Sequence, residues 1–233
     1  MLILAFETSA KACSVALYRD EALLAESYQN TGLTHSQTLM PMAETLVAQC
    51  GLTLQDVEAV AVAAGPGSFT GVRIGVAAAK GFAWGKEIPC CGVSTLESMA
   101  LGLGIHSGYV LPVMDARRSQ VYTALFYAEG GNMTRIREDR AISLQELGED
   151  IRGLDKPVFL VGDGSRVCFE ALHEAVPQLV MPPEHRMHQR AAGVGLAAQK
   201  QLLSGANCDG AALTPNYLRL SQAERERLAR EQQ

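Results

Sequence analysis

The sequence has no excess of positive charge and no apolar run long enough to cross a membrane. Its 233 residues hold 20 Lys and Arg against 25 Asp and Glu, a formal net charge of −5. Proteins that grip nucleic acid through many phosphates usually carry a basic face, so this balance argues against strong RNA binding by the chain alone and leaves room only for a local patch. The opening run, 2–6, lacks the basic region and cleavage site of a signal peptide. We therefore expect a cytoplasmic protein without a membrane segment.

The six cysteines show neither metal-site nor disulfide-framework spacing. They stand at positions 13, 50, 90, 91, 168 and 208, with no CxxC pair among them. A chain of this length with 48% hydrophobic residues can bury a core without disulfides. We therefore predict that the cysteines are buried, small hydrophobic side chains in a reducing compartment.

The most distinctive stretch is a glycine-rich turn, Gly-Pro-Gly-Ser-Phe-Thr-Gly-Val-Arg-Ile-Gly at 65–75. It follows an apolar run, 57–64, and opens a helical segment, so the pattern predicts a strand, a turn and a helix. Gly65 and Gly67 allow positive φ and close approach, and free amides at a helix start can bind an anion. The spacing is that of neither a P-loop nor a dinucleotide fingerprint. Two interpretations stay open: a phosphate cradle, or a turn needed only for packing.

The helix predicted over 70–85 carries several small residues, among them Gly71, Gly75 and Ala78. Glycine costs a helix about 1 kcal/mol relative to alanine, so its repeated use is typical of close approach by another backbone. We predict that these three residues form a ridge that packs on another helix. The alternative is that they pack inward on the chain's own sheet.

The order of predicted elements is that of a ribonuclease-H-like half, followed by a second half that begins in the same way. We expect subdomains at 1–105 and 106–220 and a charged tail at 221–233. In the first half, the pattern predicts strands at 2–6, 12–19, 23–28, 57–64 and 88–92 and helices at 34–50, at 70–85 and from Ser94 onward. In the second, it predicts strands at 109–114, 120–127, 133–141 and 158–161 and helices at 144–151, 166–175 and 189–203.

Polar residues follow the first strand of each half. Hydroxyls and amides of Glu7, Thr8 and Ser9 could meet a phosphate, and the carboxylate could hold a metal-bound water, although such turns more often serve local capping. Asp115 is the positional counterpart of Glu7 and precedes two arginines, 117 and 118. Two carboxylates and two guanidiniums facing one cleft would suit phosphate or carboxylate recognition. The alternative is an ion-pair network that closes the groove between the halves.

The histidines offer a weaker signal. His185 and His188 are three residues apart, but prolines at 182 and 183 place them in a loop and no third ligand is evident, which favours structural or solvated histidines. His35, in the first turn of the helix at 34–50, could cap that helix or contact a partner. Pro41 should kink the helix or mark its boundary.

Five ordered motifs resemble those of the TsaB family, bacterial subunits of tRNA threonylcarbamoyladenosine biosynthesis. The motifs are Leu4–Ser9, Thr34–Ser36, Gly65–Gly75, Asp115–Arg118 with Val121 and Tyr122, and Pro215–Arg219. The resemblance covers essentially the whole chain. It implies an α/β, actin-like ATPase (ASKHA) fold of two ribonuclease-H-like halves, the second one reduced. It also implies a role in placing threonylcarbamoyl on the adenosine next to the anticodon.

The family's catalytic paralogue, TsaD, carries residues that this chain lacks. Lys11 and Ala12 stand where TsaD has two acids, and Thr95 and Met99 stand where it has two metal-binding histidines. Neutral imidazoles are ligands that a borderline metal prefers. The resemblance therefore implies a scaffold with no catalytic residue, no metal and no cofactor beyond weak ATP or ADP binding at a partner interface. The alternative is an independent enzyme, either a weak nucleotide hydrolase or a protease.

The resemblance also implies partners: a heterodimer with TsaD, the ATPase TsaE, tRNA only through that complex, and a homodimer when the chain is alone. The helices at 34–50 and 70–85 would dock on the same pair of TsaD as a four-helix bundle. The predicted interface residues are His35, Leu39, Met42, Leu46, Gly71, Val72, Gly75 and Ala78. The predicted weak nucleotide or phosphate contacts are Glu7, Thr8, Ser9, Gly65, Gly67 and Asp115.

Overall fold

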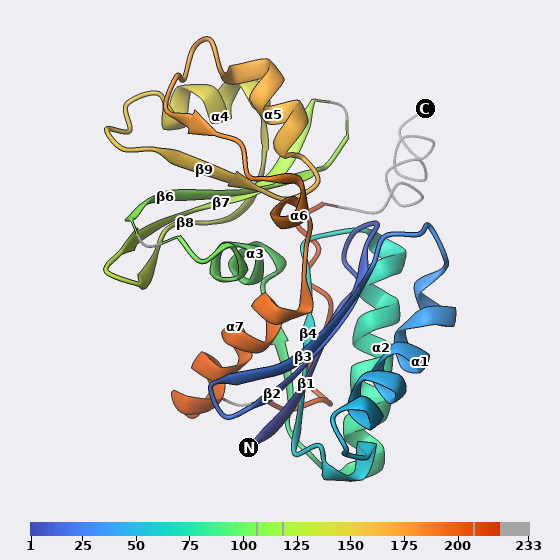
Figure 1. The fold of residues 1–233 in the computed structure, drawn as a ribbon. Helices are drawn as coiled ribbons and strands as arrows, with labels where there is room; N and C mark the ends of the chain where they lie inside the picture. The colour runs from blue at the N-terminus through green and yellow to red at the C-terminus, as the bar shows by residue number, and fades with distance from the viewer. Residues whose placement is uncertain (106, 118, 207, 220–233) are drawn as a thin grey trace, which may run out of the picture.

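Two five-stranded mixed sheets form the two halves of the molecule (Figure 1). The structure is a computed structural model that describes residues 1–105, 107–117, 119–206 and 208–219, so the predicted charged tail and Arg118 lie outside the described residues. The first sheet has the order β3-β2-β1-β4-β5 and the second the order β10-β9-β6-β7-β8. In each sheet the central strand, β1 or β6, pairs antiparallel with the next strand and parallel with the fourth strand of its half. The predicted internal duplication is therefore confirmed.

The elements of the first half lie close to their predicted positions. The strands are β1 (Leu2–Glu7), β2 (Cys13–Arg19), β3 (Ala22–Gln29), β4 (Ala59–Ala63) and β5 (Cys90–Val93). The helices are α1 (His35–Gln49), a 3₁₀ turn η1 (Leu54–Asp56), α2 (Phe69–Lys86) and α3 (Thr95–Leu103). Helix α1 runs without a break through Pro41, so the predicted boundary there is wrong.

The second half contains β6 (Ser107–Asp115), β7 (Gln120–Glu129), β8 (Asn132–Ser143), β9 (Val158–Val161) and β10 (Leu179–Val180). Its helices are α4 (Leu144–Ile151), α5 (Ser165–Leu172), α6 (Glu184–Met187) and α7 (Ala191–Leu203). The two-residue strand β10 and the one-turn helix α6 are too short to give a periodic pattern, and the sequence did not predict them.

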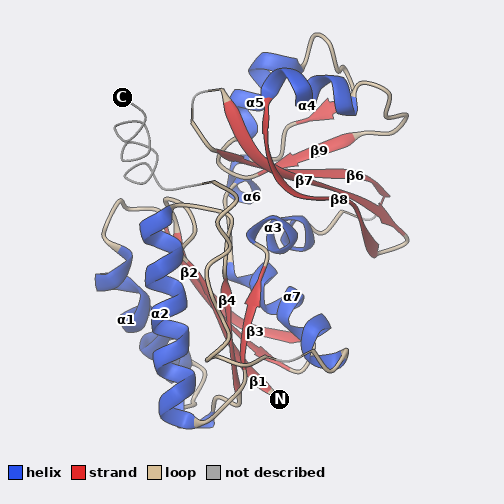
Figure 2. Ribbon diagram, turned by 180° about the vertical axis from the view of Figure 1, so that it is seen from behind, coloured by secondary structure: helices blue, strands red, loops and turns tan. Residues whose placement is uncertain are grey.

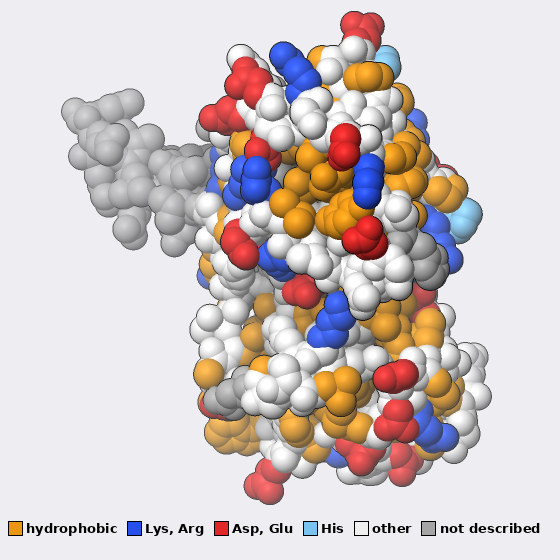
Figure 3. Space-filling model, turned by 90° about the vertical axis from the view of Figure 1, so that its left-hand side faces the viewer, with side chains coloured by type: hydrophobic (Ala, Val, Ile, Leu, Met, Phe, Trp, Pro, Cys, Tyr) orange, Lys and Arg blue, Asp and Glu red, His pale blue; other side chains and the backbone are white. Residues whose placement is uncertain are grey.

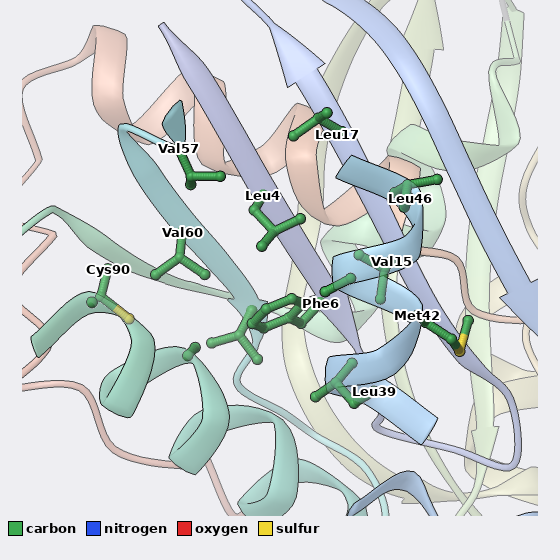
Figure 4. Packing of buried hydrophobic residues seen from close by; sticks show 14 of the residues in the cluster. Leu4, Phe6, Val15, Leu17, Leu39, Met42, Leu46, Val57, Val60 and Cys90 are labelled. Carbon is green, nitrogen blue, oxygen red and sulfur yellow. The ribbon is translucent and has the colours of Figure 1, made fainter. Parts of the chain in front are cut away.

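Strand β1 is buried on both faces, as its continuous apolar sequence indicates. Leu4 and Phe6 face a core shared with α1 and α2 (Figure 4), and Ile3 and Ala5 face a second core shared with α7. Figure 2 shows α3 and α7 between the two sheets. Helix α7 packs on the first sheet, so the predicted 106–220 subdomain differs from the observed packing.

Helices α3 and α7 pack closely against each other within the chain. A Cβ at Gly193 of α7 would overlap the carbonyl oxygen of Ser98 in α3, and a Cβ at Gly102 would lie 3.5 Å from Cα of Gly193. Small residues here let the two helices between the sheets touch. Among the helices with described residues, none is both long and apolar enough to span a membrane.

A disulfide joins Cys91 of β5 to Cys208, which follows α7. The prediction that all six cysteines are unpaired small hydrophobes is wrong for this pair, because a separation of 117 residues leaves no local spacing to recognise. The prediction holds for Cys13, Cys90 and Cys168, which are free and buried.

Candidate functional site: the domain junction and the outer face of α1 and α2

The carboxyl group of Glu7 is fully buried where β1 ends, at the junction of the two halves. Its Oε1 accepts a 2.6 Å hydrogen bond from the Ser9 amide, whereas its Oε2 has no partner among the described residues. Burial, with a smaller contribution from the nearby charge of Asp163, raises the pKa of Glu7 to about 7. Glu7 is therefore poised between its neutral and ionised forms near neutral pH.

The glycine turn is filled by the chain itself. A Cβ at Gly65 would overlap the carbonyl oxygen of Asn216, and a Cβ at Gly67 would lie 2.5 Å from that of Ser9. The Ser68 amide donates to the Ser9 carbonyl at 2.6 Å, and Gly65 accepts from the Thr95 amide at 2.9 Å. In this structure the turn has the packing role that the sequence left open beside a phosphate cradle, and nucleotide binding there stays a prediction.

Asp115 ends β6 as Glu7 ends β1, but it is exposed and accepts from the Arg117 amide at 2.7 Å. Asp163, in the turn after β9, has an environment more like that of Glu7 than Asp115 has. Burial raises the pKa of Asp163, and Gln189 donates to it at 2.9 Å. The sequence signal that could have identified Asp163 is its position in the turn 161–164, directly after a predicted strand of the second half.

A cavity of about 340 Å³ lies between the halves, and both sequence-predicted histidines of the 184–188 loop line it. At its edge, Arg190 donates to Glu26 through Nε at 3.0 Å and Nη2 at 2.8 Å. His188 Nε2 lies 3.9 Å from Glu184 Oε1. Among the described residues, no three His, Cys, Asp or Glu side chains come together as a metal site.

Four of the predicted interface residues point inward. Figure 4 shows Leu39, Met42 and Leu46 directed from α1 toward the strands, where they join the core, and Val72 of α2 is buried with them. They cannot be surface contacts in this structure, so their assignment to an interface is corrected: hydrophobic burial against β1 and β2 explains their spacing.

The glycines of the predicted ridge are also turned inward. A Cβ at Gly71 would overlap the carbonyl oxygen of Thr8, and a Cβ at Gly75 would overlap Oγ1 of Thr8. The close approach is therefore made to β1 of the same chain, which was the alternative that the sequence left open. Ala78 is half-buried, and His35 donates from Nε2 to the Ala10 carbonyl at 2.8 Å.

Helices α1 and α2 lie side by side on the face of the first sheet opposite α7 (Figures 1 and 2). The residues of these two helices that point away from the sheet form a second surface. We call it the outer face. On α2 it consists of exposed residues on the side turned away from the sheet, among them Trp84, which is 80% exposed. A Cβ at Gly81 or Gly85 would meet nothing within 4 Å. The outer face comprises Pro41, Thr45 and Ala48 of α1 and Ala77, Gly81, Trp84 and Gly85 of α2.

Thr95 and Met99 are buried parts of α3. The amide of Thr95 donates to Gly65, and Met99 packs with Leu96, Val110 and Phe126 between the sheets. Of the two positions where the resemblance to TsaD implies imidazoles, the one at Met99 is part of a hydrophobic cluster, and the one at Thr95 is a buried polar side chain.

Comparisons with known proteins agree with this architecture. The family model described as TsaD, tRNA N6-adenosine threonylcarbamoyltransferase, matches residues 29–227. The tRNA threonylcarbamoyladenosine biosynthesis protein TsaB of Bacillus subtilis is 34% identical over 225 residues, which cover 96% of each chain. The chain belongs to the TsaB family. TsaB of Escherichia coli is 40% identical over 149 residues, 63% of this chain and 64% of its own.

Two solved structures have folds similar to this chain. YeaZ from Pseudomonas aeruginosa superposes with a TM-score of 0.75 at 26% identity, covering 93% of this chain and 99% of its own. Component A of (R)-2-hydroxyglutaryl-CoA dehydratase from Acidaminococcus fermentans reaches a TM-score of 0.50 at 13% identity over 87% of this chain and 99% of its own, a likeness of fold alone. The predicted α/β, actin-like ATPase architecture is confirmed.

Proposed function

We propose that this chain is a non-catalytic scaffold subunit for threonylcarbamoylation of the adenosine next to the anticodon in tRNA. It would act in the cytoplasm, pairing with the catalytic paralogue TsaD and with the ATPase TsaE. Membership in the TsaB family supports the pathway, because relatives over the whole chain are named for this biosynthesis. The observation that carries the scaffold role is Met99, which fills a hydrophobic cluster at a position where TsaD has a metal-binding histidine.

The outer face of α1 and α2 is the surface that best suits a partner helix pair. Ala77, Gly81 and Gly85 leave the backbone of α2 open to close approach, and Trp84 adds a large apolar side chain beside them. Because TsaD shares the fold, its equivalent helices would meet this face as a four-helix bundle. The proposed interface therefore uses the predicted pair of helices, but its contact residues are those of the outer face and not the buried residues.

Charge supports contact with tRNA only through the complex. The chain carries a net charge of −5, and on the face turned to the viewer in Figure 3 acidic and basic side chains are mixed. A protein that binds RNA on its own would present a field of positive charge to the phosphates. We therefore assign tRNA binding to the assembled complex.

The interface is tested by pull-down with TsaD. Gly81→Arg places a long charged side chain on the outer face without a clash in the folded chain, because nothing lies within 4 Å of its Cβ. Gly153→Arg is the matched control, since Gly153 is exposed and equally open but belongs to the second half. We expect Gly81→Arg to lose TsaD and Gly153→Arg to retain it. A folded Gly81→Arg protein that binds TsaD normally would place the interface elsewhere.

The non-catalytic role is tested in a reconstituted transfer reaction with and without this chain. Transfer should require the chain, and Glu7→Gln and Asp115→Ala should leave it largely intact where assembly is preserved. A several-hundredfold loss of rate in an assembled complex would assign these acids to chemistry.

Turnover of ATP by the purified chain, lost in the same variants, would favour the weak nucleotide hydrolase instead. Weak binding of ATP or ADP at the partner interface remains part of the proposal.

A further inference from the structure

After α7, the described residues 208–219 pass along the first sheet and reach the second half. We call residues 208–219 the strap. Its backbone is held at several points: Cys208 accepts from the Cys90 amide at 2.8 Å, and Asn216 donates to the Ala64 carbonyl at 2.7 Å. Lys80 of α2 donates to the Leu213 carbonyl at 2.9 Å. The strap is therefore a single pass of chain that rests on β5, α2 and the glycine turn.

Side chains fix the far end of the strap. Tyr217 stacks on Phe69 with 4.9 Å between ring centroids, and its hydroxyl accepts from Arg73 Nε at 2.7 Å. Arg219 donates to the Ala116 carbonyl, in the loop after β6, at 2.7 Å. These contacts tie the strap to the start of α2 and to the second half.

The near end of the strap is fixed by the bond between Cys91 and Cys208, whose Cα atoms are 4.6 Å apart. Cys91 is buried in β5, whereas Cys208 is partly exposed as the first residue of the strap. A thiol that oxidants reach, next to a buried one that can resolve it, is the arrangement of a reversible disulfide.

We propose that Cys91 and Cys208 form a reversible thiol–disulfide site that fastens and releases the strap. In oxidation, the Cys208 thiolate attacks a small-molecule disulfide such as oxidised glutathione, forming a mixed disulfide and expelling one glutathione thiolate. The Cys91 thiolate then attacks Sγ of Cys208 and expels the second. The protein loses two protons and two electrons, and one oxidised glutathione becomes two reduced ones. Reduced glutathione reverses both steps.

The neighbouring thiols are unsuited to this exchange. Cys90 precedes Cys91 but faces the opposite core, under α2, where burial raises its pKa to about 11. Burial raises the pKa of Cys168 to about 12. Cys90 and Cys168 pack in other core clusters than Cys91 and Cys208, so neither lies where it can exchange with this pair.

Trapping and peptide mass spectrometry test the site. The full chain is equilibrated in glutathione buffers of varied ratio, alkylated and digested. We expect one linked pair, Cys91 with Cys208, that forms and is lost as the ratio changes, and a normal response in Cys90→Ser. No linked peptide in oxidised glutathione would overturn the proposal, as would a link that neither reduced glutathione nor dithiothreitol opens in the folded protein.

Hydrogen exchange of the same samples tests the fastening. Amides of Leu213 and Asn216 are bonded within or by the strap, and we expect them to exchange at least about tenfold faster in the reduced protein. Cys208→Ser should show the fast rates in either buffer, while Cys90→Ser should keep the redox difference. Equal strap exchange in oxidised and reduced wild-type protein would show that the bond does not control the strap.

Discussion

Gly75 of α2 lies directly against Thr8 at the end of β1. A Cβ at position 75 would overlap Oγ1 of Thr8 and lie 3.2 Å from Cγ2 of Val62. One turn earlier, the carbonyl oxygen of Gly71 accepts a 2.8 Å hydrogen bond from that same hydroxyl. The absence of side chains at these glycines brings α2 onto the first sheet, so the outward face of the helix is free for another contact.

This relationship predicts opposite effects for two glycine substitutions in one helix. Gly75→Ala should lower the free energy of unfolding by roughly 1–3 kcal/mol, because the methyl group overpacks a buried contact. Gly81→Ala should raise it by about 0.5–1 kcal/mol, because nothing lies within 4 Å of the new Cβ and alanine favours the helix. Urea denaturation of the isolated chain measures both. A stabilising Gly75→Ala would mean that α2 stands further from β1.

The sequence predicted where α2 begins and ends but not how it is rotated. Small residues occur all around the helix, so their size alone could not separate the face on the sheet from the outer face. The larger apolar residues carry that signal: Val72 and Val76 are four apart and both buried, and Ala79 and Ala83 continue their stripe. Following that stripe places Gly81 and Gly85 outside.

The junction was harder to predict for a different reason. Glu7, Thr8 and Ser9 were found because they follow a clear strand, yet their partners come from distant parts of the chain. Asn216, which fills the space beside Gly65, and Cys208, which bonds to Cys91, belong to the strap. A segment without periodicity leaves no pattern that shows where it packs, so its contacts require the fold.

The buried carboxyl of Glu7 predicts a stability that falls as pH rises. Its folded-state pKa is raised from 4.5 to about 7, so between these values the folded state binds more protons than the unfolded state. The contribution is fully present below pH 4.5 and is lost as pH rises through 7, with an upper limit on the order of 3 kcal/mol. Glu7→Gln keeps an acceptor for the Ser9 amide but cannot ionise.

The measurement is the difference in unfolding free energy between Glu7→Gln and wild type at several pH values. This difference should shift in favour of the variant from pH 5 to pH 8. Asp163, whose pKa is also raised, is present in both proteins, so most of its effect cancels. A difference that is flat with pH would show that Glu7 titrates normally.

Metal analysis gives a third expectation. His185 and His188 line a cavity, and among the described residues no three His, Cys, Asp or Glu side chains come together there, while Thr95 and Met99 are packed in α3. Elemental analysis of the purified chain should therefore find well below one iron or zinc ion per chain, with no change in the double variant His185→Ala, His188→Ala. One metal ion per chain that disappears in this variant would refute the expectation.

The outer face predicts a two-fold homodimer of the isolated chain. A two-fold interface uses the same surface on both copies, and Ala77, Gly81 and Gly85 allow two α2 helices to approach closely. Trp84 is the only tryptophan of the chain and is 80% exposed in the monomer, so its fluorescence reports whether this face is covered.

Sedimentation should show a dimer whose tryptophan emission shifts to longer wavelength on dilution. Gly81→Arg should be monomeric with the long-wavelength emission at all concentrations, and Gly153→Arg should behave as wild type. A dimer that survives Gly81→Arg with its Trp84 emission unchanged by dilution would require another interface.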